Sequence, residues 1–229
     1  MGLKLVYESV SDNLLLFALN LGALLLLSVV VLFALICRKH WQREKRHREA
    51  YEIERLLKCL TDTGLFHQSN QRFYAKLHGF IDHHYLDLLY AFARISRTLS
   101  GKDLETYYVN AVRCGLFEQI PHNLISTNPE KICIALEICG LAGLRQHINI
   151  IENYSCQPVY APFACHALVR LNFDEGMASL FRAFGHNVVN NAELLIICSE
   201  FDQQKLVAWA FESSHWPLPE VLQKYWIFR

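Results

Sequence analysis

The pattern of apolar residues divides the chain into a continuous apolar run near the N-terminus and a longer region where apolar residues recur at helical spacing. The stretch from Leu14 to Cys37 (LLLFALNLGALLLLSVVVLFALIC) is apolar almost throughout, and no charged residue lies between Asp12 and Arg38. About 20 apolar residues suffice to cross the hydrocarbon core, and a helix satisfies its own backbone in lipid. The pattern therefore predicts a transmembrane helix over 13–37, after a short non-cytoplasmic N-terminus at 1–12. The run is too long for a cleaved signal peptide, so we expect it to remain as an anchor.

The charges that flank this segment predict its orientation. A basic juxtamembrane segment at 38–50 holds six Lys or Arg residues, whereas the N-terminal flank holds only Lys4. Positive residues stay on the cytoplasmic side. We therefore expect a single-pass protein of the inner or plasma membrane, with its N-terminus outside and its C-terminal domain in the cytoplasm. The residues expected at the membrane interface, as a topology signal or as ligands of anionic lipid, are Arg38, Lys39, Trp41, Arg43, Lys45, Arg46 and Arg48.

One polar residue inside the span suggests association between helices. Asn20 lies beside Ala18 and Gly22, which form a small-xxx-small pair. Small residues let membrane helices approach closely, and a buried amide can donate a hydrogen bond across them. We therefore expect Asn20 and Gly22 to contact a partner, either another membrane protein or a second copy of this chain. The alternative is a single amide that the membrane tolerates.

Beyond the basic segment, apolar residues recur at helical spacing. The stripe from Ile53 to Leu60 follows the i, i+3, i+4, i+7 pattern of one helix face. A single longer helix is predicted from Phe73 to Ile95, and a partner helix from Asp103 to Cys114. No stretch alternates with period two for long enough to predict a strand. Residues 51–229 are therefore expected to form a cytoplasmic, all-α domain.

The last hundred residues show internal similarity. Segments that start at Ile134, Ala164 and Leu194 align at a spacing of 30 residues. Each segment predicts a helix, a tight turn and a second helix, and Asn128-Pro129 is a typical start for the first one. The positions expected in the core are Ile138, Leu168 and Cys198; Leu141, Leu171 and Phe201; Ile148, Ala178 and Ala208; and Ile151, Phe181 and Phe211.

This pattern resembles the HEAT-like helical repeats. The resemblance rests on Ala135 to Leu141 (ALEICGL) and on Ala167 to Leu171 (ALVRL) before Asp174-Glu175-Gly176. It covers roughly 128–213, with a period shorter than the usual ~40 residues. The resemblance implies an α-solenoid, whose stacked helix pairs expose a concave surface that binds other proteins. A generic helical bundle is the alternative.

The sequence offers little that points to catalysis. It contains no phosphate-binding loop, nucleophile elbow or zinc-protease motif. The 22 Lys and Arg balance the 22 Asp and Glu, which disfavours a nucleic-acid binder. We therefore expect no catalytic, cofactor-binding or metal-binding residues and no cofactor. A metal- or Cys/His-dependent enzyme is the alternative, and two clusters of residues support it. The first cluster is His78, Asp82, His83, His84 and Asp87, and the second is Cys156, Cys165 and His166.

The end of the chain is rich in aromatic residues. An apolar end can cap the stack of helices or dock on another protein, and aromatic side chains dominate protein interfaces. We expect partner contacts from Trp216, Trp226 and Phe228.

Together these patterns predict a membrane-anchored adaptor or scaffold without catalysis. It would bind, position or regulate a partner membrane protein, such as an enzyme or transporter complex, beside the lipid bilayer. An accessory subunit of a bacterial polysaccharide-synthesis or secretion complex is one such role. A self-assembling membrane scaffold is another alternative.

Overall fold

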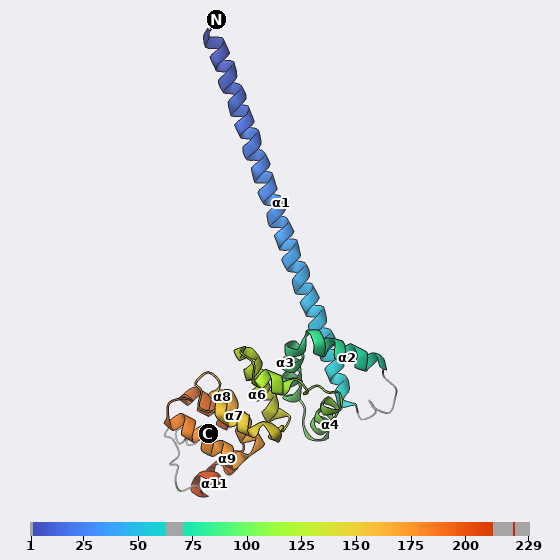
Figure 1. Ribbon diagram of the computed structural model, residues 1–229, viewed down its shortest axis with the longest axis vertical. Coiled ribbons are helices and arrows are strands. Elements are labelled where there is room, and N and C mark those ends of the chain that lie inside the picture. Colours follow the sequence, from blue (N-terminus) through green and yellow to red (C-terminus); the bar gives the residue numbers. More distant parts are fainter. Residues whose placement is uncertain (1, 63–70, 213–221, 223–229) are drawn as a thin grey trace. The chain divides into compact units, whose positions relative to one another are not determined.

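The computed structural model describes residues 2–62, 71–212 and 222, and every regular element among them is a helix (Figure 1). This confirms the all-α class. The chain divides into two compact units, Met1–Glu52 and Ile53–Arg229. The predicted assignment of the second unit to HEAT-like repeats stays a prediction.

The first unit is one straight helix. α1 (Gly2–Lys58) is continuous in Figure 1, and the basic segment prolongs it without a break. Apolar side chains from Leu24 to Ile36 are 51–68% exposed. The described stretch Leu24–Thr61 has a peak mean hydropathy of 1.9. The protein therefore has a helix near its N-terminus that is long and apolar enough to span a membrane.

The second unit begins with the last turns of α1, which form part of its core. Ile53, Leu57 and Leu60 are buried, as the predicted stripe requires. A short 3-10 turn, η1 (Cys59–Thr61), follows and packs on α4 (Gly101–Arg113). The buried Asn110 amide donates hydrogen bonds to the carbonyls of Leu60 (2.7 Å) and Asp62 (3.1 Å). These bonds fasten the end of α1 to the domain.

The single helix predicted from Phe73 to Ile95 is wrong, because the structure has two. α2 (Gln71–His83) and α3 (Tyr85–Ser96) meet at His84, whose backbone leaves the helical region (φ −133°, ψ 34°). The change of direction at His84 allows both apolar stripes to enter the core, and it brings the Tyr85 hydroxyl within 2.8 Å of the Leu116 carbonyl, to which it donates. The short helix α5 (Ile120–Leu124) then completes this half of the domain.

Three helix pairs make up the remainder of the chain. α6 (Pro129–Leu141) precedes η2 (Arg145–His147) and α7 (Ile148–Tyr154); α8 (Ala161–Leu171) precedes α9 (Phe173–Gly185); and α10 (Asn191–Ser199) precedes α11 (Gln203–Glu212). Two of the starts are capped as their sequences suggest. Asn128 accepts from the Glu130 amide, and Asn190 forms a reciprocal capping box with Glu193.

The predicted repeat register is right at some core positions and wrong at others. Ile138, Leu168 and Cys198 are all buried, as are Leu171, Ile151 and Phe181. Leu141, which ends α6, and Phe201, which lies in the turn before α11, are only partly buried. Ile148 and Ala178 are also partly buried, and Ala208 is exposed. The side chain of Phe211 lies outside the described residues.

α8 is the central helix of this region, since it packs most extensively against both α6 and α9. Glycines permit both contacts. A Cβ atom on Gly140 of α6 would lie 2.8 Å from the Ala167 Cα, and one on Gly176 of α9 would lie 2.3 Å from the Val169 nitrogen. The backbones therefore approach more closely than any side chain would allow.

Candidate functional site

A groove between α8 and α10 is the strongest candidate for partner contact. It has a volume of about 350 Å³, and its lining includes Val159, Phe163 and Ile196. These apolar side chains are 65%, 40% and 62% exposed. Residues next to them in sequence are buried in the core, such as Ile197, whose side chain is 3% exposed. The helices that line the groove thus have apolar residues on both an inward and an outward face, which is unusual for a surface helix.

Ion pairs on the lining join elements that are 30 to 40 residues apart in sequence. His166 Nε2 lies 2.8 Å from Glu200 Oε2, and Arg170 of α8 donates to the same carboxylate. Arg97, just after α3, is joined to Glu137 of α6 at 2.5 Å. His166 and Arg170 together lower the pKa of Glu200 to about 2, against the opposing effect of its burial. Glu200 is therefore ionised at neutral pH.

The sequence forms this groove by local rules. Pro162 occupies the first turn of α8, where its missing N–H costs nothing. The Asn190–Glu193 capping box fixes the start of α10. Arg170 and Glu200 are 30 residues apart, at equivalent positions of the second and third segments. Sequence reasoning missed this pair, although the repeat alignment contains the signal that could have found it.

The side chains of the predicted partner-contact residues fall outside the described residues. Asn20 and Gly22 lie in α1, but their side chains fall outside the described residues. Trp216, Trp226 and Phe228 also lie outside them. Leu222, from the same C-terminal stretch, is fully buried in a cluster that includes Phe181 and Trp209. At least this residue of the tail is thus part of the domain core.

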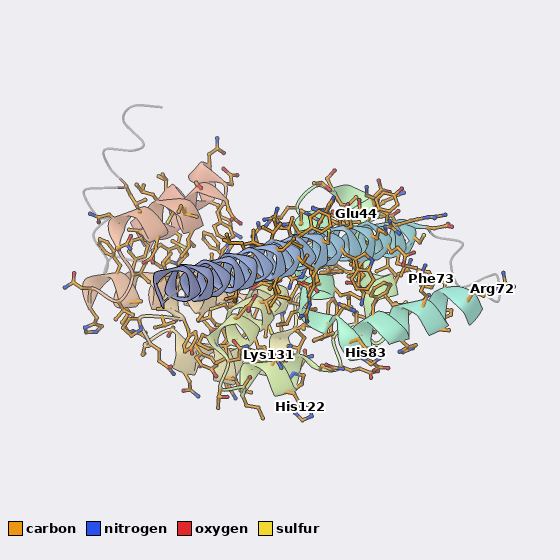
Figure 2. The ribbon with its side chains drawn as sticks, turned by 90° about the horizontal axis from the view of Figure 1, so that it is seen from above. Glu44, Arg72, Phe73, His83, His122 and Lys131 are labelled. Atoms are coloured by element: carbon orange, nitrogen blue, oxygen red, sulfur yellow. The ribbon has the colours of Figure 1, made fainter. Side chains whose placement is uncertain are left out.

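The predicted membrane-interface residues are all exposed along α1. Within this helix Lys45 pairs with Glu49 at 3.7 Å, and Arg48 pairs with Glu44 at 3.0 Å, each one turn apart. Figure 2 shows the Glu44 side chain beside α1. The prediction that these residues meet a bilayer stays a prediction.

The histidine cluster is arranged differently from its predicted single helix. α2 ends at His83 and α3 begins at Tyr85, so the cluster is divided between two helices. His84 lies 3.6 Å from Asp87, while His78, Asp82 and His83 are exposed. Across the described ranges, no three His, Cys, Asp or Glu residues are grouped as metal ligands.

The second candidate cluster is divided between core and surface. Cys165 is buried, and burial raises the pKa of its thiol to about 12, so the reactive thiolate is scarce at neutral pH. Cys156 is exposed, and His166 is engaged by Glu200. This arrangement does not favour a cysteine nucleophile at position 165.

Comparison with known proteins gives no match to a family model, a curated protein or a solved structure.

Proposed function

We propose that the protein is a non-catalytic, single-pass membrane adaptor whose α8–α10 groove binds a segment of a partner membrane protein. The groove carries the proposal. Val159, Phe163 and Ile196 present apolar surface on a face that ion pairs hold in shape, and exposed apolar surface with a polar rim is typical of protein-binding sites.

The exposed apolar length of α1 supports the membrane anchor. Its basic flank at 38–50 favours a cytoplasmic position for the second unit, by the bias of positive residues. A short tether keeps a domain close to the bilayer and raises its effective concentration for other membrane proteins. The partner is therefore proposed to be a membrane enzyme or transporter complex.

Paired substitutions test the groove. Ile196→Asp places a charge in the groove, whereas Val112→Asp places one on α4 at a similarly exposed aliphatic residue, 56% against 62%. The full chain and both variants are purified in mild detergent, and the membrane proteins that accompany each are identified. We expect a partner that is retained with wild type and Val112→Asp and lost with Ile196→Asp. A partner retained by both variants would exclude the groove as its docking surface.

A fusion tests the anchor and its orientation separately. A reporter placed after Arg229 should be active only in the cytoplasm, and the fusion should sediment with membranes after an alkaline wash. A reporter active only on the outer side would reverse the orientation, and release by the wash would exclude the membrane span.

A further inference from the structure

A second cavity lies beside the turn between α8 and α9, and two of its basic residues, Arg145 and Lys205, take no part in the groove. Its volume is about 640 Å³, and three basic residues contribute to its lining: Arg145, Arg170 and Lys205. They come from η2, α8 and α11, one from each of the three helix pairs. The stacking of the pairs thus gathers cations that are far apart in sequence.

The charge of this lining is positive. Asp174 is its only carboxylate among the described residues. Arg170 is partly neutralised by Glu200, with which it forms an ion pair. Within the described residues Arg145 and Lys205 have no carboxylate partner, and Lys205 lies 4.2 Å from the centre of the Phe173 ring. Two cations therefore remain available to an anion.

The walls of the cavity add an apolar surface to this charge. Phe173 and Phe201 meet edge to face with their ring centres 5.8 Å apart, and Ile148 also lines the cavity. The volume is within the ~300–1,000 Å³ of small-molecule sites, which combine apolar walls with a few polar groups. The ligand should accordingly carry both an anionic group and an apolar or aromatic part.

We propose that this cavity binds a phosphate ester, with Arg145 and Lys205 contacting the phosphate and the two phenylalanines contacting the attached group. Two cations suit a dianion better than a single carboxylate, and arginine offers paired donors to phosphate oxygens. Asn172 and Phe173, at the start of α9, also line the cavity, and the Asn172 side chain makes no cap on the helix. The phosphate can belong to a soluble nucleotide or to a lipid headgroup.

Calorimetric titration of the full chain in detergent with inorganic pyrophosphate tests the site. We expect saturable binding of one pyrophosphate per chain, weakened about tenfold by Arg145→Gln or Lys205→Gln, because each removes a charge-assisted hydrogen bond. The control is Arg182→Gln, which removes an exposed cation from the last turn of the same α9 helix. Melting curves verify that all variants fold.

The absence of saturable binding would overturn the proposal, as would an equal loss in the Arg182→Gln variant, which would indicate non-specific attraction. Competition then identifies the source of the phosphate. Adenosine diphosphate and a short-chain phosphatidic acid should each displace bound pyrophosphate. Tighter binding of the nucleotide would indicate a soluble ligand, and tighter binding of the lipid a headgroup. Equal affinity for all three would overturn the role of the phenylalanines.

Discussion

The close contact of α8 with α9 depends on the absence of one side chain. A Cβ atom at position 176 would lie 2.3 Å from the Val169 nitrogen and 2.4 Å from both the Leu168 carbonyl carbon and the Val169 Cα. All three atoms are backbone, so no rotamer change relieves the overlap. The two helices would have to separate by about 1 Å to restore an ordinary contact of about 3.5 Å.

The expected cost of Gly176→Ala follows from this geometry. Overpacking a core costs about 1–3 kcal/mol, and contact with backbone places this site near the upper end. Alanine recovers about 1 kcal/mol because it favours the helix more than glycine does. The net loss is therefore about 2 kcal/mol, which corresponds to about 4–8 °C in melting temperature for a protein of this length.

Gly185→Ala is the matched control, because Gly185 ends the same helix, is exposed, and has no atom within 4 Å of the position that a Cβ would occupy. It should keep the helix gain without the clash. Thermal melts of the full chain in detergent, followed by circular dichroism, compare the two. If Gly176→Ala melts at or above the temperature of Gly185→Ala, the tight α8–α9 contact is refuted.

Two further substitutions test other parts of the domain. Asn110→Ala should lower the free energy of unfolding by about 1–3 kcal/mol in chemical denaturation, since the Leu60 carbonyl loses its donor, and no change would mean that the end of α1 is held in another way. Leu171→Asp should abolish the cooperative melt because an unpaired buried charge costs several kcal/mol, whereas the exposed Ile196→Asp should not. Full helicity and an unchanged melt in Leu171→Asp would contradict the repeat register.

The features that the sequence predicts well depend on neighbouring residues. The long charge-free run and the Asn128-Pro129 helix start are local signals, and the structure contains both a continuous apolar helix and a helix that begins at Pro129. The 30-residue alignment also places Ile138, Leu168 and Cys198 in the core. All three lie within helices, on α6, α8 and α10, and are at most 5% exposed.

The features that the sequence misses depend on packing between distant elements. Apolar spacing continues across His84, so periodicity alone cannot detect the break that separates α2 from α3. The Arg97–Glu137 pair joins residues 40 positions apart, and no local motif indicates it. The groove is likewise a product of stacking, because Phe163 and Ile196 look like core residues when each helix is read alone.

The link between the second and third helix pairs should give the protein a specific sensitivity to acid. The pKa of Glu200 falls from 4.5 to about 2 in the folded state, first through its hydrogen bond with His166 and also through Arg170. A depressed carboxylate pKa stabilises the fold above the unfolded value, and this contribution is lost as the pH falls from about 4.5 towards 2. Glu200→Gln cannot titrate, so its melting temperature should be lower than that of wild type at pH 6 and should converge with it near pH 2. Melting temperatures over this range measure the effect, with Glu175→Gln, an exposed carboxylate on α9, as the control. A constant difference between wild type and Glu200→Gln at every pH would show that the carboxylate does not hold α10 against α8 through its charge.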